Sequence, residues 1–287
     1  LGNDGDDVYL FGPVPGGSLL EEDKIQELAS AGIDTLDFSG LDTGITVDLT
    51  TSLIAQQPGT GNVREVNVET PGQEANFEHI IGTEFDDILT GNNLANTIAA
   101  LGGSDQVDGQ GADDVIDLGT GLNESASTGT GNDLVLFADD WGSATVSDSG
   151  DDDTLDFSAV TVPLTFSFGS LEVTDGTNTV THVNNDFEHV IGGQQDDQFV
   201  FADMASLPGG GTIDGQGGTD LLDYTAYTTG VNVDLSAGSA TGAPGGILSV
   251  ENVTGGQGVD ILTGDDGPNV LHGGPGGDQI TGLEVIG

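Results

Sequence analysis

Acidic residues recur in this chain at a spacing of nine, and this regularity makes them the first candidates for chemistry. Near the C-terminus three consecutive segments, residues 255–281, read GGQGVDILT, GDDGPNVLH and GGPGGDQIT. A second run starts at residue 82 and reads GTEFDDILT, GNNLANTIA, ALGGSDQVD, GQGADDVID and LGTGLNESA. The sixth position of every segment is Asp or Asn: Asp87, Asn96, Asp105, Asp114, Asn123, Asp260, Asn269 and Asp278.

Single segments of the same form occur elsewhere and add further acids at the sixth position. They begin at residues 2, 29, 128, 148, 192 and 215. Their sixth-position residues are Asp7, Asp34, Asp133, Asp153, Asp197 and Asp220.

The eighth position of the segments in the two runs is apolar, with Ser125 as the one exception. Glycine permits backbone conformations with positive φ, so the first six residues can form a tight turn. The last three residues fit a very short strand with one side chain pointing inward. Two segments then make one coil of a flattened solenoid, and residues 18 apart lie over one another. This places Asp87 over Asp105, Asn96 over Asp114, and Asp260 over Asp278.

Stacked carboxylates repel one another, and Ca²⁺ can reverse this repulsion. It accepts six to eight oxygen ligands, from carboxylates and from backbone carbonyls. Zinc is a poor candidate because the chain has no cysteine and four histidines. Mg²⁺ fits less well because it prefers a rigid octahedron and keeps its waters. All the sixth-position residues named above are therefore candidate ligands of multiple Ca²⁺ ions.

Composition leads to the same expectation. The chain has 49 acidic residues and only two basic ones, Lys24 and Arg64, and a formal charge of −47. Self-repulsion at this charge opposes a compact state, so positive charge must come from outside the chain. Bound cations would supply it; the acidic surface of a protein adapted to high salt is the alternative. Nucleic acid is excluded as a partner because phosphate contacts need Lys and Arg. No apolar run is long enough for membrane insertion as a helix.

A longer period predicts the domain organisation. DTLDFS at 34–39 recurs at 153–158 and as DLLDYT at 220–225, and FEHIIG at 77–82 recurs as FEHVIG at 187–192 and VENVTG at 250–255. Three composite units are predicted, at 1–128, 129–191 and 192–287, with repeat blocks at 82–126 and 255–281. His79 and His189 lie in the FEH motifs, where we expect a structural role.

GGQGVDILT and GGPGGDQIT resemble the GGxGxDxUx pattern of RTX, or haemolysin-type, calcium-binding repeats. This resemblance implies an all-β fold of right-handed parallel β-roll (β-solenoid) blocks, secretion by a type I system, and folding with calcium outside the cell. The segments between the blocks look like those of very large bacterial surface proteins. Asn96, Asn123 and Asn269 depart from Asp, so we expect weaker or empty sites there.

The expected function is structural and non-catalytic: a calcium-binding segment of a large extracellular or cell-surface protein, arranged as an elongated tandem array. A filament, surface layer, biofilm matrix or adhesin stalk would suit it, with copies of itself, neighbouring repeats or a cell-surface glycan as partners. Since the sequence opens at Leu1 without Met, we expect it to be part of a longer precursor. The alternative is the C-terminal secretion and stability module of an RTX hydrolase or toxin. Its catalytic domain would lie elsewhere, because HExxH and GxSxG are absent here.

Overall fold

Short β-strands dominate the computed structural model, which describes residues 5–13, 20–26, 32–56, 63–69, 71–170, 172–183, 187–282 and 285–286. The only helical element in these ranges is the 3₁₀ helix η1 (Gln73–Asn76). No helix of the described residues has the length and apolar character needed to span a membrane. The predicted all-β class is therefore confirmed. The chain separates into two compact units, 1–136 with 140–151, and 137–139 with 152–287, which are treated separately below.

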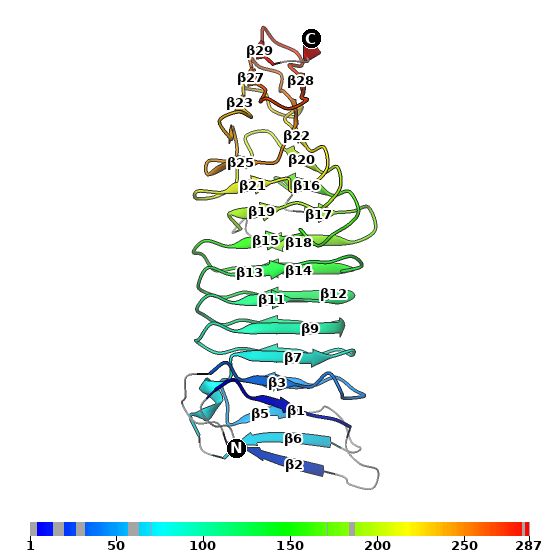
Figure 1. Cartoon of the computed structure of the whole chain (residues 1–287), viewed down its shortest axis with the longest axis vertical. Coiled ribbons are helices and arrows are strands. Elements are labelled where there is room, and N and C mark those ends of the chain that lie inside the picture. The colour runs from blue at the N-terminus through cyan, green and yellow to red at the C-terminus, as the bar shows by residue number, and fades with distance from the viewer. Residues whose placement is uncertain are drawn as a thin grey trace. The chain divides into compact units, whose positions relative to one another are not determined.

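The first unit consists mainly of two rows of parallel strands (Figure 1). One row is β1 (Val8–Leu10), β3 (Thr35–Asp37), β7 (His79–Thr83), β9 (Thr97–Gly103), β11 (Val115–Asp117) and β13 (Leu134–Leu136). The other row is β4 (Thr46–Asp48), β8 (Ile88–Thr90), β10 (Gln106–Asp108), β12 (Thr120–Ser127) and β14 (Ser143–Ser147). β5 (Leu53–Gln56) pairs with β4, β6 (Val63–Val68) pairs with β5, and β2 (Leu20–Ile25) pairs with β6.

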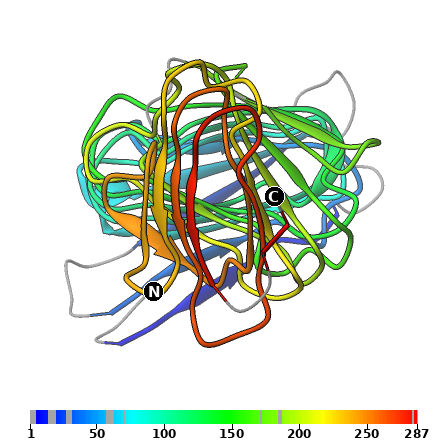
Figure 2. The same cartoon turned by 90° about the horizontal axis from the view of Figure 1, so that it is seen from above.

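The second unit repeats this plan with three parallel rows. One is β15 (Thr154–Asp156), β19 (His189–Ile191), β21 (Thr212–Asp214) and β25 (Gly246–Leu248). The next is β16 (Thr165–Phe168), β20 (Gln198–Phe201), β22 (Leu221–Asp223), β26 (Asn252–Thr254), β28 (Val270–His272) and β30 (Val285–Ile286). The last is β23 (Asn232–Asp234), β27 (Ile261–Thr263) and β29 (Gln279–Thr281). Antiparallel strands β17 (Glu172–Thr174), β18 (Thr179–Val183) and β24 (Ser239–Ala240) flank β16 and β23. In Figure 2 the C-terminal coils, in orange and red, follow one another as loops.

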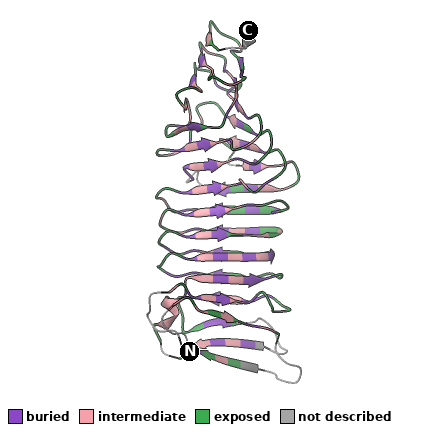
Figure 3. Cartoon of the chain, viewed as in Figure 1, coloured by how far each residue is buried: buried purple, intermediate pink, exposed green. Residues whose placement is uncertain are grey.

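The expected stacking of residues 18 apart is confirmed in both repeat blocks. Leu89 pairs with Val107, Ile98 with Ile116, and Leu262 with Ile280. Each of these residues is the middle one of a strand triplet and points inward, because successive side chains in a strand face opposite sides. Figure 3 shows the resulting alternation of buried and less buried positions along the strands.

The register shifts by one residue at Asn123. A β-bulge between Leu122 and Glu124 leaves Asn123 without a partner on β14, and its φ is 65°. As a result Val107 pairs with Ala126, not with Ser125. The inward position is thus apolar here too, and Ser125 is no exception to the pattern.

Aromatic residues fill the core of the second unit. Rings stack face to face between Phe137 and Phe157, with centroids 4.5 Å apart, and between Phe201 and Tyr224, at 4.7 Å. Such pairs contribute about 0.5–1.5 kcal/mol beyond the area that they bury. The three DTLDFS-type motifs form β3, β15 and β22, and the three FEH-type motifs lead into β7, β19 and β26. Residues 2–4 and 29–31 of the predicted turns lie outside the described residues, and the division into three composite units stays a prediction.

Candidate metal centre

The acid ladder, by which we mean the sixth-position side chains and those that occupy equivalent places, lies inside the coils. Asp105 and Asp153 are completely buried, and Asp278 and Asp7 are half-buried. Asn123 is exposed and lies outside the ladder. The remaining predicted residues are all at most 2% exposed: Asp34, Asp87, Asn96, Asp114, Asp133, Asp197, Asp220, Asp260 and Asn269.

Successive members of the ladder are joined by hydrogen bonds between coils. The backbone N–H of Asp87 donates to Oδ1 of Asp105, 2.8 Å away, and the N–H of Asp260 donates to Oδ1 of Asp278, at 3.0 Å. A backbone N–H directed at an ionised oxygen partly offsets its charge. The same bond joins Asp7 to Asp34, Asn96 to Asp114, Asp114 to Asp133, and Asp197 to Asp220.

Some turns supply a second N–H, which we call the closing N–H, from the residue four positions before the ladder residue. Thr83 donates it to Oδ2 of Asp87 at 2.6 Å, and Gly256 donates it to Oδ2 of Asp260 at 2.8 Å. Both oxygens of these carboxylates then have backbone donors, because the N–H groups of Ile45 and Val231 reach Oδ1. Asp197, Asn96 and Asn269 also accept a closing N–H.

Other turns direct this N–H elsewhere. Gln110 donates it to Oδ1 of Asp108 at 3.2 Å, and Gln216 to Oδ1 of Asp214 at 3.0 Å. Each acceptor is an aspartate at a strand end, where its side chain bonds the backbone two residues later, as Asp commonly does in turns. The ladder carboxylate of such a turn therefore loses its second donor.

The buried ladder oxygens that lack a hydrogen-bond partner among the described residues include Oδ2 of Asp105, Oδ2 of Asp114 and Oε1 of Glu124. An unsatisfied buried polar atom costs about 1–3 kcal/mol, and more when it is charged. Burial raises the pKa of Asp105 and of Asp114 to about 8; a backbone N–H opposes this rise and nearby negative charges add to it. Near neutral pH each of these groups calls for a proton or a cation.

The two basic side chains do not provide that cation. Lys24 lies 3.6 Å from Glu22 and is largely exposed. Arg64 pairs with Asp23 and donates to the carbonyl oxygen of Gly12. Both positive charges are thus already engaged with other groups of the first unit.

The first glycine of the turns makes room for the ladder. A Cβ at Gly82 would lie 2.5 Å from Oδ2 of Asp87, and one at Gly192 would lie 2.7 Å from Oδ2 of Asp197. Neither glycine has a φ in the left-handed region, so close approach is what excludes a side chain there. Positive φ, which the sequence predicts for the turns, occurs at the second and fourth positions, as at Gln110 with 77° and Gly103 with 134°.

Glutamates that sequence reasoning missed complete the ladder. The N–H groups of Asp34, Asp153 and Asp220 donate to Oε2 of Glu78, Glu188 and Glu251, at 2.9, 3.0 and 2.8 Å. The N–H of Asp105 donates to Oε2 of Glu124 at 2.7 Å. A sequence signal exists for all four, because each stands two residues before an inward apolar residue, as Asp87 stands before Leu89. Glu78, Glu188 and Glu251 do not follow a glycine-rich turn of the repeat pattern, and Glu124 lies one residue beyond the sixth position of its segment.

A further pair of acids lies close together in the first unit. Asp133 and Asp148 are buried and place ligand oxygens within 4.8 Å of one another. Thr128 donates its hydroxyl to Oδ1 of Asp148 at 2.6 Å. Burial raises the pKa of Asp133, and the charge of Asp148 is among the groups that raise it further. Two such carboxylates could share one cation.

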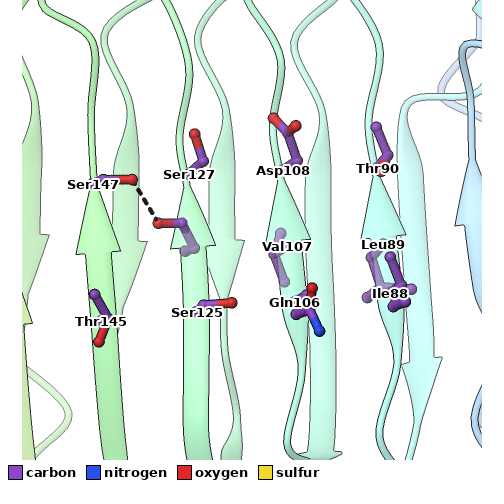
Figure 4. Close-up of a pocket in the computed structure, with 11 residues that line it drawn as sticks. Ile88, Leu89, Thr90, Gln106, Val107, Asp108, Ser125, Ser127, Thr145 and Ser147 are labelled. Atoms are coloured by element: carbon purple, nitrogen blue, oxygen red, sulfur yellow. Dashed lines mark hydrogen bonds between the residues drawn. The ribbon is translucent and has the colours of Figure 1, made fainter.

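Other polar groupings offer less chemistry. A depression of about 360 Å³ on the outer side of β8, β10, β12 and β14 is lined by apolar residues such as Ile88 and by small polar residues such as Ser125 and Thr145. Figure 4 shows them spaced along the strands. Asp108 is the one acid in this lining, and its carboxylate already accepts the backbone and side-chain N–H groups of Gln110.

His189 in the second unit bonds Oγ1 of Thr212 at 2.6 Å and Oδ1 of Asp152 at 2.8 Å. A hydroxyl, an imidazole and a carboxylate are linked in the same order in catalytic sites where the imidazole activates the hydroxyl as a nucleophile. Acyl transfer also needs N–H donors for an oxyanion. The N–H of Thr212 donates to the carbonyl of Glu188, and the N–H of Gly246 to that of Ala243. Those donors are already engaged, so the grouping gives no support to catalysis.

Comparison with known proteins adds nothing to these observations: no family model matches the chain, and a search of curated proteins finds no match.

Proposed function

We propose that this chain is a non-catalytic, calcium-binding structural segment of a large secreted or cell-surface protein, built as right-handed parallel β-roll blocks. The observation that carries the proposal is the set of buried ladder oxygens on Asp105, Asp114 and Glu124 that find no donor among the described residues. A divalent cation would satisfy them and would also reduce the net charge of −47.

Calcium fits these positions better than other cations. The donors are carboxylates in backbone turns that also carry carbonyl oxygens, the ligand set that Ca²⁺ accepts with flexible geometry. The described ladder contains no histidine and the chain no cysteine, which disfavours zinc. The likeness of GGQGVDILT to RTX repeats supports the same ion.

An extracellular location follows from the expected affinity. Calcium sites of extracellular modules have dissociation constants of about 10⁻⁴ to 10⁻³ M, far above cytosolic calcium. We therefore infer that the chain folds outside the cell, at a bacterial surface, after type I secretion. Filaments, surface layers, biofilm matrices and adhesin stalks are the settings that a rigid, repetitive, acidic segment would serve, through contacts with its own copies, neighbouring repeats or a surface glycan.

The test is a comparison of folding with and without calcium. Circular dichroism of the full chain in EGTA at low ionic strength should show little β-structure, and millimolar CaCl₂ should restore it. Equimolar MgCl₂ controls for divalent charge, and concentrated NaCl controls for adaptation to high salt. Identical β-signals in EGTA and in calcium would refute the proposal, and restoration by NaCl alone would favour a salt-adapted surface.

A further inference from the structure

The turns of this chain differ in whether a ladder carboxylate keeps an oxygen for a metal, although their sequences look alike. We propose that calcium enters the first unit at the turns without a closing N–H, with Asp105, Asp114 and Glu124 as ligands, and that the turns closed over Asp87, Asp197 and Asp260 take no metal. This inference rests on the proposed function and specifies which of the repeats perform it.

A closed turn leaves no room for a cation beside its carboxylate. Oδ1 of Asp87 accepts the N–H of Ile45 at 2.7 Å and the hydroxyl of Thr83 at 2.9 Å, and Oδ2 accepts the N–H of Thr83 at 2.6 Å. Oδ1 and Oδ2 of Asp260 likewise each accept a backbone N–H at 2.8 Å. The hydrogens of these donors carry positive partial charge and would repel Ca²⁺. Calcium would have to break two charge-assisted bonds to bind there.

An open turn has the opposite character. Oδ1 of Asp105 accepts one N–H, from Asp87, while its Oδ2 has no partner within the described ranges. The next ladder member, Glu124, accepts the N–H of Asp105 on Oε2 and has no described partner on Oε1. Consecutive members of one stack therefore each hold a free oxygen, at full or nearly full burial.

Charge strengthens this site. Asp86 adds a negative charge that acts on both Asp105 and Glu124. Asp86 itself accepts the N–H of Ser104 at 2.9 Å, which holds it beside the stack. Asp105 and Glu124 each accept one buried N–H, and Asp86 lies beside them. These donors leave the negative charge of the three carboxylates uncompensated, which is the condition for cation binding.

Glu124 belongs to this site only because of the bulge. The extra residue, Asn123, turns outward, and the residue after it enters the ladder. The ligand is thus a glutamate outside the sixth position. By contrast Asp260, in the segment that matches the RTX pattern best, is closed by its own backbone.

Calcium stoichiometry of the full chain separates the two kinds of turn. Equilibrium dialysis with metal analysis would compare the parent chain with Asp105→Asn/Glu124→Gln, with Glu124→Gln alone, and with the closed-turn controls Asp87→Asn and Asp260→Asn. Circular dichroism at saturating calcium confirms that each variant has folded. We expect the double variant to lose about one ion per chain. Glu124→Gln should raise the dissociation constant of the same ion at least tenfold. Both control variants should bind as many calcium ions per chain as the parent.

The possible failures are distinguishable. A folded Asp87→Asn or Asp260→Asn variant that loses an ion overturns the division into open and closed turns. Unchanged binding by Glu124→Gln removes Glu124 from the site. If a control variant does not fold, amide hydrogen exchange of the calcium-loaded parent chain decides. The N–H groups of Thr83 and Gly256 should be protected because they stay bonded to Asp87 and Asp260, and rapid exchange of either would overturn the division. A parent chain that binds no calcium refutes the proposed function itself.

Discussion

Asn269 lies one coil after Glu251 and donates its side-chain amide to the Glu251 carbonyl oxygen, 3.0 Å away. Asn96 stands in the same relation to Glu78, at 3.3 Å, and the separation is 18 residues in both cases. A carboxylate could not donate there and would face a carbonyl oxygen. Both asparagines thus donate to the carbonyl oxygen of a glutamate in the preceding coil, which is a different role from the weakened calcium site that their departure from Asp suggests.

Asn269→Asp should therefore destabilise the protein, although it restores the repeat consensus. Losing the donor and burying a carboxylate against a carbonyl should lower the free energy of unfolding by about 1–3 kcal/mol. Urea unfolding in saturating calcium measures the change. Asn123→Asp is the matched control, because Asn123 is exposed, and it should change stability little. A stabilised Asn269→Asp variant that binds more calcium would show that the consensus view is correct.

Metal-free protein should become more stable as the pH falls from 8 towards 4. Burial, opposed in part by backbone N–H donors, raises the pKa of Asp105 to about 8, of Asp220 to about 7 and of Asp197 to about 6. A carboxyl whose pKa is higher in the folded state binds more protons there, so its contribution is present below the unfolded pKa and is lost as the pH rises through the folded value. Circular dichroism in EDTA across this range tests the direction, because the fraction of folded metal-free chain should grow as the pH falls. With saturating calcium the contribution of Asp105 should be lost, since the cation replaces its proton, while that of Asp197, whose turn takes no metal, should remain. An unchanged pH dependence in calcium would contradict this account.

His182 should act in the opposite direction. It is 4% exposed, its ring meets that of Phe187 edge-on, and burial lowers its pKa to about 4. Because the unfolded histidine takes up a proton first, the stability contributed by this residue is lost as the pH falls from about 6.5 to 4, a difference of about 3 kcal/mol.

The variant His182→Phe isolates this effect. Its free energy of unfolding, minus that of the parent chain, should rise steadily as the pH is lowered through this window. A constant difference at all pH values would mean that His182 is not held neutral by its surroundings.

Gly192→Ala should test the close approach of the ladder to the first glycine of a turn. The added Cβ would lie 2.7 Å from Oδ2 of Asp197 and 2.9 Å from the carbonyl oxygen of Gly215, so the turn must move, at a cost of about 1–3 kcal/mol. Gly210→Ala is the control in the same unit, because a Cβ there meets nothing within 4 Å. Thermal unfolding in calcium compares the two, and equal midpoints would show that the turn yields without strain.

The nine-residue period, the inward apolar residue of each triplet and the stacking of residues 18 apart could all be predicted from the sequence. Leu89, Val107 and their equivalents obey a local rule, the alternation of side chains in a strand, and two equal segments make one coil. Burial of the ladder aspartates follows from the same rule, since Asp87 stands two residues before Leu89.

Only the tertiary structure decided how each ladder residue is satisfied. The N–H of Thr83 reaches the ladder carboxylate of its own turn, whereas that of Gln110 reaches Asp108 instead. The backbone of each turn and the competing acid decide between these outcomes. The side-chain amide of Asn269 has its acceptor in a different coil. The bulge at Asn123, which brings Glu124 into the ladder, leaves no sign in the residue types of the repeat pattern. The closing N–H is a contact within one turn, whereas the bonds of Asn269 and Glu124 join coils 18 and 19 residues apart. The acids that look equivalent in the repeat pattern are therefore distinguished only when the turns and their neighbouring coils are in place.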